Sequence, residues 1–159
     1  MKNTQFSQRE EKVVAYCRVS TKSQKEDLEK QVENVKSYMY AKGYSFEVIT
    51  DVGSGINYKN KGLQELISLI DSNQVTKVVI LYKDRLVRFG FELIQLLCEL
   101  HGVEIEIIDN SEQSKDEELT NDLIQIVTLF ANRLYGSRSK KTKTLIERVS
   151  DVTRDENRT

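Results

Sequence analysis

VVAYCRV, residues 13–19, is the stretch that decides the fold, because it combines the β-branched, apolar and aromatic residues of a buried strand. Similar short runs lie at residues 45–50, 77–82 and 103–108. The run KVVILY at 77–82 is almost continuously apolar, as expected for a strand covered on both faces. Segments with helical spacing separate these runs, so the alternation predicts a three-layer α/β/α fold around a mostly parallel sheet.

The spacing of apolar residues predicts helices at residues 24–42, 63–71 and 90–101, and a long helix from about residue 116. Gly43 and Gly102 supply stops after the first and third of these helices. We expect the long helix to continue past Gly136 to Val149. The chain then forms an extension at 1–12, one domain at 13–150 and a frayed tail at 151–159.

The composition is that of an ordinary globular protein, with 38% hydrophobic and 31% charged residues among 159. No apolar run approaches the length of a membrane span, and the first residues lack the apolar core of a signal peptide, so we expect a cytoplasmic protein. Cys17 and Cys98 lie in apolar stretches and are expected in the core. With His101 as the single histidine, they cannot form a Cys/His zinc site.

Positive charge is concentrated near the end of the chain, although the net charge is −1. Residues 133–148 contain six basic residues and one acidic residue. A basic segment can contact DNA phosphates even in a nearly neutral chain, although it can also be a solvated helix face. The candidate DNA contacts are Arg133, Arg138, Lys140, Lys141 and Lys143.

The residues that can carry chemistry follow the predicted strands. Tyr16, Arg18 and Ser20 fall on one side of the first strand, because strand side chains alternate faces. An arginine in a central strand is costly to bury without an anion. Arg18 can form an ion pair with Asp51 or Asp84, but this pairing leaves the nearby hydroxyl of Ser20 unexplained.

The segment KDRLVRFG, residues 83–90, adds two arginines at another strand end. Arg85 and Arg88 are three residues apart and can point together if the segment enters a helix. Together with Arg18 they place three guanidinium groups near Ser20. Arginine suits phosphate oxygens, and such a cluster could stabilise phosphoryl transfer without a metal. The single histidine disfavours a Ser-His-Asp hydrolase, and no P-loop motif is present.

Three motifs resemble those of serine recombinases. Residues 16–21, YCRVST, followed by Gln24 and Gln31, resemble the Y-x-R-V-S-T-x-x-Q opening of that family. Residues 51–55, DVGSG, are similar to its T-D-x-x-S-G segment, and residues 84–88, DRLVR, are similar to its D-R-L-x-R motif. The motifs keep the family's order and spacing, and the resemblance covers residues 13–150.

The resemblance implies that Ser20 attacks a phosphate of double-stranded DNA and forms a 5′-phosphoserine intermediate. It implies that Arg18, Arg85 and Arg88 bind the phosphate, and that Asp84 orients these arginines. No metal and no cofactor are implied. The partners implied are a homodimer on each DNA site and a tetramer in the synaptic complex. Tyr16 completes the implied catalytic set, and Gln24, Gln31 and Asp51 are implied to support the site.

The chain departs from the resolvase pattern at two positions. Asn60, flanked by Lys59 and Lys61, stands where resolvases usually have an arginine. Asn132 occupies what looks like the position of their glutamate early in the long helix. Residues 134–139, LYGSRS, instead resemble a transposase branch whose members carry a DNA-binding domain before the catalytic domain. We therefore expect a catalytic domain without its DNA reader.

Two other functions remain open at this stage. Asp51, Asp84 and Asp109 at strand ends could ligate a metal in a nuclease or phosphatase, although the arginines would repel the ion. A non-catalytic, receiver-like assembly module would share the α/β architecture.

The long helix predicts self-association, because its apolar surface is wider than one sheet contact requires. A neighbouring helix of the same chain could cover this surface instead. The stripe consists of Leu119, Leu123, Ile126, Phe130 and Leu134, widened by Ile124, Val127 and Leu129.

Overall fold

A four-stranded parallel sheet forms the centre of the computed structural model, which describes residues 10–110, 116–136 and 139–156. The strand order is β2-β1-β3-β4, and every neighbouring pair is parallel. The predicted α/β architecture is confirmed. The strands are β1 (Val13–Val19), β2 (Phe46–Val52), β3 (Lys77–Ile80) and β4 (Glu104–Ile107).

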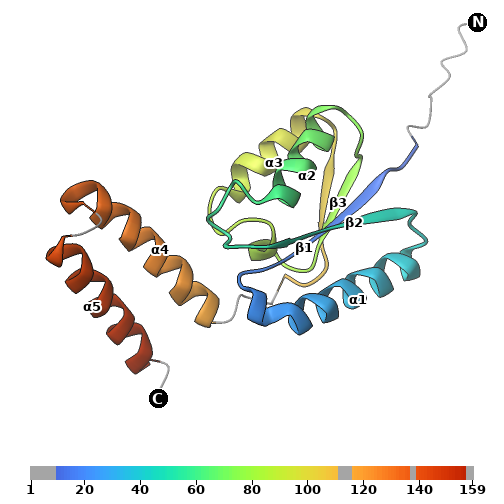
Figure 1. Cartoon of the computed structure of the whole chain (residues 1–159). Helices are drawn as coiled ribbons and strands as arrows, with labels where there is room; N and C mark the ends of the chain where they lie inside the picture. Colours follow the sequence, from blue (N-terminus) through green and yellow to red (C-terminus); the bar gives the residue numbers. More distant parts are fainter. Residues whose placement is uncertain (1–9, 111–115, 137–138, 157–159) are drawn as a thin grey trace, which may run out of the picture.

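Helices cover both faces of the sheet (Figure 1). Helix α1 (Lys25–Lys42) packs on one face, whereas α2 (Lys61–Asp71) and α3 (Phe91–Leu100) pack on the other. The alternation along β1 explains this division. Val14 and Tyr16 belong to the core with α2 and α3, whereas Ala15 and Cys17 belong to the core with α1. All seven residues of β1 are buried, as its central position requires.

The strand ends differ from the sequence expectation by a few residues. β2 continues to Val52, because its pairing with β1 extends through Val19. β3 ends at Ile80, two residues earlier than expected. The chain then turns through the short 3₁₀ helix η2 (Lys83–Arg85), and a similar turn, η1 (Lys22–Gln24), follows β1. The early end of β3 leaves the last residues of β1, from Cys17 to Val19, without a paired β3 residue.

The predicted single long helix is in fact two helices, α4 (Asp116–Tyr135) and α5 (Lys140–Glu156). The chain breaks at Gly136, whose φ of 84° lies in the left-handed region that glycine tolerates at the end of a helix. The frayed tail predicted from residue 151 is wrong as far as Glu156, because α5 includes these residues.

Helices α4 and α5 form a hairpin that extends away from the sheet (Figure 1). The Thr142 hydroxyl donates to the carbonyls of Ala131 (3.3 Å) and Gly136 (2.9 Å) across this hairpin. Ala131 and Thr142 are both buried, so the two helices are closely packed at this point.

Both cysteines lie in the core as free thiols, as predicted. Burial raises the pKa of Cys17 to about 12 and that of Cys98 to about 11. The two thiols therefore remain protonated at neutral pH. Within the described ranges, no helix is both long and apolar enough to span a membrane.

Candidate active site at the carboxyl edge of the sheet

Arg18 lies buried at the carboxyl end of β1 and joins three segments of the chain. Its guanidinium donates to the backbone carbonyls of Gly53 (3.0 Å), Asp84 (2.6 Å) and Arg85 (3.2 Å). Its Nη1 also lies 3.4 Å from the Ser20 hydroxyl. Burial, followed by the charge of Arg85, lowers the pKa of Arg18 from its usual value. These contacts bring the sequence-predicted Ser20 and the Asp84–Arg85 segment to one place.

Gln31 completes the backbone hydrogen bonding of Arg18. Its Nε2 donates to the Arg18 carbonyl, and its Oε1 accepts from the Arg18 amide, both at 3.0 Å. The pairing of β1 with β3 ends at Tyr16 and Ile80, so Arg18 has no β3 residue opposite it. A buried amide without a partner is costly, and the Gln31 side chain takes the place of the missing strand.

Gln24 positions the backbone of the serine loop. Its Oε1 accepts hydrogen bonds from the amides of Ser20 (3.0 Å) and Thr21 (3.1 Å). Ser20 is itself partly exposed. The backbone of Ser20 is therefore held in place while its hydroxyl remains accessible to an incoming group.

Arg85 is fully buried and forms an ion pair with Glu118 of α4. Both of its terminal nitrogens donate to the Glu118 carboxylate, and its Nη1 also donates to the Arg18 carbonyl at 2.6 Å. Burial raises the pKa of Glu118, but the hydrogen bond and charge of Arg85 outweigh burial and lower the pKa overall. Glu118 is therefore held as a buried carboxylate.

Arg88 lies among three carboxylates, those of Asp84, Glu118 and Asp122. Its Nε donates to Asp122 of α4 at 2.8 Å, and its Nη1 donates to Asp84 at 2.9 Å. The other oxygen of Asp122 accepts a hydrogen bond from the Ser54 hydroxyl. Ser54 and Asp122 are both buried, so the loop after β2 and α4 meet at Arg88.

Tyr16 and Asp51 belong to the framework below the site. The Tyr16 hydroxyl donates to Asp51 at 2.6 Å, and burial raises the tyrosine pKa far above its usual value. Asp51 also accepts the amides of Gly62 and Leu63 at 2.8 Å. These amides start α2, where a carboxylate is favourable for the helix dipole. The predicted catalytic neighbour Tyr16 thus makes the contacts of a residue that fixes α2 to the sheet.

Asn60, the residue that the sequence comparison matched to a resolvase arginine, holds the loop between β2 and α2 together. Its side chain is buried, donates to the Ser54 carbonyl (2.9 Å) and accepts from Asn57 (3.2 Å). A Cβ on Gly55 would lie 2.9 Å from Arg18 Nη2 and 3.1 Å from the Arg88 amide. Gly55 therefore allows the loop to approach the arginines closely.

The sequence interpretation missed three residues of the site: Ser54, Glu118 and Asp122. Glu118 lies in the first turn of α4 and binds Arg85, whereas the comparison of Asn132 with a resolvase glutamate stays a prediction. The available signal was the four-residue spacing of Glu118 and Asp122, which puts both on one helix face. Acidic residues at a helix start are common for the helix dipole alone, so the spacing does not stand out.

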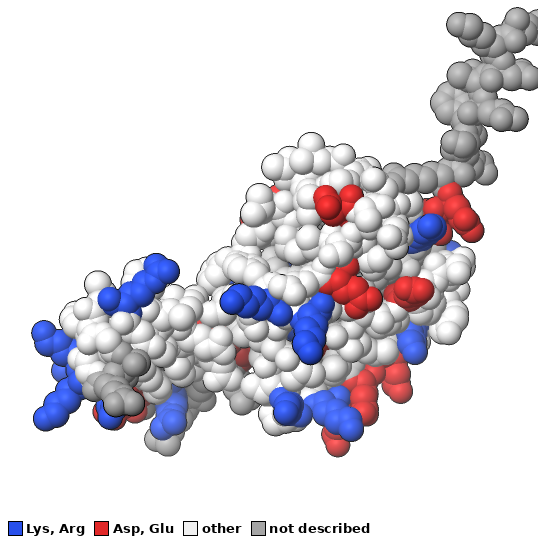
Figure 2. Space-filling view, turned by 45° about the horizontal axis from the view of Figure 1, so that its top comes forward, with Lys and Arg blue, Asp and Glu red and all other residues white. Residues whose placement is uncertain are grey.

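The predicted DNA contacts lie at the far end of the hairpin. Arg133, Lys140, Lys141 and Lys143 are exposed there, whereas Arg138 lies outside the described residues. Figure 2 shows basic side chains gathered on this end of the molecule. A hollow of about 390 Å³ adjoins Lys140, Lys141 and Arg148.

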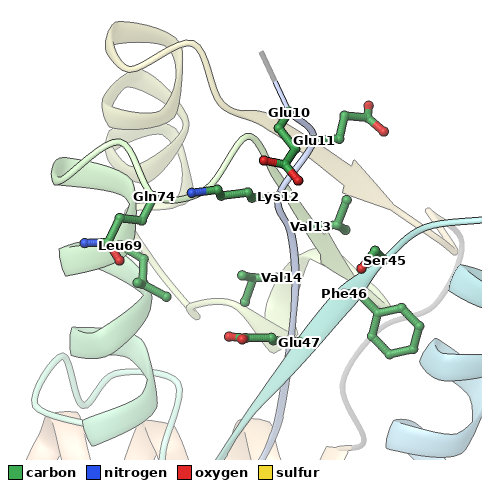
Figure 3. Close-up of a pocket in the computed structure, with 10 residues that line it drawn as sticks. All are labelled: Glu10, Glu11, Lys12, Val13, Val14, Ser45, Phe46, Glu47, Leu69 and Gln74. Atoms are coloured by element: carbon green, nitrogen blue, oxygen red, sulfur yellow. The ribbon is translucent and has the colours of Figure 1, made fainter. Parts of the chain in front are cut away.

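A larger hollow, of about 470 Å³, lies at the opposite edge of the sheet (Figure 3). It is lined by the start of β1, the start of β2 and part of α2, including the carboxylates of Glu10, Glu11 and Glu47. These acidic groups would repel a phosphate. The hollow is therefore separate from the arginine site in both place and charge.

The arrangement does not favour the metal-site alternative. Asp51 uses its two oxygens for three hydrogen bonds within the framework. In the part of the chain that the structure describes, no three His, Cys, Asp or Glu residues lie close enough together to hold a metal ion.

The comparisons with known proteins agree with this geometry. Residues 13–150 match the family Resolvase, N terminal domain. The C-terminal catalytic domain of ISC1926 TnpA, an IS607-like serine recombinase, is 45% identical with a TM-score of 0.83, covering 89% of this chain and 97% of that domain. A serine recombinase from Sulfolobus solfataricus is 43% identical with a TM-score of 0.75, over 89% and 97%.

A viral protein is also similar to this chain over most of its length. The Acanthamoeba polyphaga mimivirus protein "Putative resolvase L103" is 39% identical over 145 residues, which cover 90% of this chain and 74% of that protein. The fold and the site together define a serine recombinase catalytic domain. This chain belongs to the resolvase family, and its solved relatives include IS607-like recombinases.

Replacing Tyr16 with Phe should destabilise the domain by about 1.5–3 kcal/mol, because the change removes a buried hydrogen bond to the Asp51 carboxylate. Urea denaturation measures this free energy. Tyr40→Phe is the matched control and should change stability by less than about 0.5 kcal/mol, since Tyr40 is 70% exposed. Equal stability of the two variants would contradict the framework role of Tyr16.

Proposed function

We propose that this chain cuts and rejoins DNA through Ser20, the role that its family places on the serine of this motif. The carrying observation is the 3.4 Å approach of Arg18 Nη1 to the Ser20 hydroxyl at the carboxyl edge of the sheet. Arg18 also binds the carbonyls of Asp84 and Arg85, which begin the segment that carries the other two arginines. Ser20 is partly exposed beside this cluster, so its hydroxyl is accessible from solvent.

In the proposed step, the Ser20 oxygen attacks the phosphorus of a DNA phosphodiester. A bond forms between this oxygen and phosphorus, and the bond from phosphorus to the 3′ oxygen breaks. The Ser20 proton leaves, and the departing 3′ oxygen gains a proton to become a hydroxyl. The 5′-phosphoserine link conserves the bond energy, so a 3′ hydroxyl of another strand can reverse the step without ATP.

Three arginines would stabilise the charge that builds on the phosphate oxygens. Arg18, Arg85 and Arg88 are buried at the base of the site, where the low dielectric strengthens their attraction for an anion. Asp84 would orient Arg88, which it already binds at 2.9 Å. Asp84 would also assist proton transfer, the second role that the family resemblance implies for it.

The supporting residues would act by position. Gln24 fixes the Ser20 amide, Gln31 fixes the Arg18 backbone, and Asp51 with Tyr16 fixes the start of α2. We propose that none of these four touches the phosphate during the reaction.

Double-stranded DNA is the proposed substrate, because the family acts on DNA. The basic end of the α4–α5 hairpin would contact the phosphate backbone, which adds affinity without sequence preference. Acting on DNA would place the chain at the nucleoid within the cytoplasm. The likeness to IS607-like TnpA favours transposition as the biological role.

Self-association through α4 is the second part of the proposal. Leu129, Phe130 and Leu134 remain 63%, 66% and 68% exposed although α5 packs beside them. The neighbouring helix of the same chain therefore does not cover the apolar stripe. A second copy would cover it, and a symmetric dimer is the commonest assembly of soluble proteins. Pairing of dimers on two DNA sites would give the tetramer.

Replacing Ser20 with Ala should abolish the covalent link, because no nucleophile remains to form it. A nicked suicide substrate traps the adduct, which denaturing electrophoresis separates from free DNA. Ser23→Ala is the matched control, since Ser23 is exposed three residues away. An adduct retained by Ser20→Ala would refute the assignment.

Replacing Arg88 with Ala should slow adduct formation by about 10²–10³, comparable to the loss of one oxyanion donor. Single-turnover cleavage measures this rate. Lys83→Ala removes an exposed charge of the same segment and should leave the rate within about twofold. A wild-type rate in Arg88→Ala would make this arginine a purely structural residue.

Replacing Phe130 with Asp should convert a dimer into a monomer, because the charge would be buried at the interface. Sedimentation across a range of concentrations measures the association, and circular dichroism checks that the helices persist. Leu93→Asp is the control, because Leu93 is 72% exposed on α3, away from the hairpin. A wild-type chain that stays monomeric at high micromolar concentration would count against the interface.

A further inference from the structure

We propose that Glu118 and Asp122 occupy the phosphate site of the resting chain, so that the start of α4 must withdraw before DNA can bind. We call these two residues the carboxylate pair. The inference rests on the proposed phosphate-binding role of Arg85 and Arg88. It adds a step that precedes chemistry, and it assigns that step to side chains of this chain.

The geometry of the carboxylate pair resembles the contacts expected of a bound phosphate. The pair is four residues apart on one face of α4, with exposed fractions of 3% and 2%. Glu118 receives both terminal nitrogens of Arg85, and Asp122 receives the Nε of Arg88 at 2.8 Å. Arginine presents the same forked donors to carboxylates and to phosphates. The carboxylate pair therefore occupies arginine N–H donors that a bound DNA phosphate would need.

The charges in the site support the same interpretation. Three arginines, at 18, 85 and 88, face the three carboxylates of Asp84, Glu118 and Asp122. Their formal charges cancel, so an incoming phosphodiester would meet no net attraction and two buried carboxylates of its own sign. Withdrawal of the carboxylate pair would leave a formal charge of +2 around Ser20.

The packing of α4 against the sheet domain is polar. In the described part of α4, three side chains are buried: Glu118, Asp122 and Ala131. Ala131 belongs to the contact with α5, whereas Leu119 and Leu123 beside the carboxylate pair are 40% and 44% exposed. Ion pairs and hydrogen bonds thus dominate this contact, and an anion that competes for the arginines can replace them.

The carboxylate pair also reaches the serine loop. Gln24 donates to Glu118 at 2.8 Å while its oxygen holds the amides of Ser20 and Thr21. Ser54, from the loop after β2, donates to Asp122. Withdrawal of α4 would therefore release the arginines and free one side of both loops that flank the site.

The first test measures DNA affinity without cleavage, in a Ser20→Ala background. The double variant Glu118→Gln, Asp122→Asn keeps the side-chain shapes and removes both charges. We expect it to bind a short DNA duplex at least about tenfold more tightly by fluorescence anisotropy, since each tenfold gain needs only a modest change in free energy. The control is Asp116→Asn, Asp151→Asn, which removes two exposed charges from α4 and α5.

The gain must depend on the arginines. Adding Arg88→Ala to the charge-neutral double variant should remove most of the gain. An affinity equal to that of the exposed-charge control would overturn the proposal, and so would a gain that persists without Arg88.

The second test uses the wild-type sequence, so its result does not depend on whether a variant folds. Hydrogen exchange of the amides at residues 118–126 should become faster when a short duplex is added, because the start of α4 leaves the sheet domain. Unchanged or slower exchange at saturating DNA would overturn the proposal.

Adduct formation separates this inference from the proposed function. With Ser20 present, the charge-neutral double variant should form the adduct faster than wild type. A slower rate would mean that the carboxylate pair holds the arginines for chemistry, which overturns the proposal. The absence of an adduct from both proteins would refute the role of Ser20, and the affinity and exchange results would still decide the role of α4.

Discussion

The site depends on one buried guanidinium, that of Arg18. A buried charged side chain at the end of a central strand needs hydrogen-bond acceptors nearby, and the Arg18 guanidinium donates to three backbone carbonyls. These carbonyls belong to the loop after β2 and to the turn after β3, so one side chain fixes the ends of three neighbouring strands. Gln31 then binds the Arg18 backbone from α1. Arg18 thus holds the backbone of the site in place and also supplies positive charge for the chemistry.

The fold could be predicted because its signals are local. The apolar run at 13–19 and the glycine after α1 are readable within a few residues, and strands and helices follow them closely. The break at Gly136 was missed, because apolar spacing continues on both sides of the glycine. The left-handed φ at this position, with Thr142 packed back against Ala131, decides between a bend and a straight helix.

The site could be predicted only in part. Ser20 and the three arginines lie at strand ends or shortly after them, where a parallel sheet gathers functional groups, so their proximity could be predicted. Ser54, Glu118 and Asp122 were missed because their partners lie 33 to 94 residues away along the chain. Tyr16 shares a face of β1 with Arg18, but alternation does not tell a framework contact from a catalytic one. Its bond to Asp51 does.

Helix α4 also sets the distance between the arginine site and the basic turn of the hairpin. Its 20 residues span about 30 Å at 1.5 Å per residue, from the arginines at one end to the basic turn at the other. This distance is close to one helical turn of B-form DNA, about 34–36 Å. In the resting chain, a DNA segment that touched both the arginines and the basic turn would therefore have to cover close to one full helical turn.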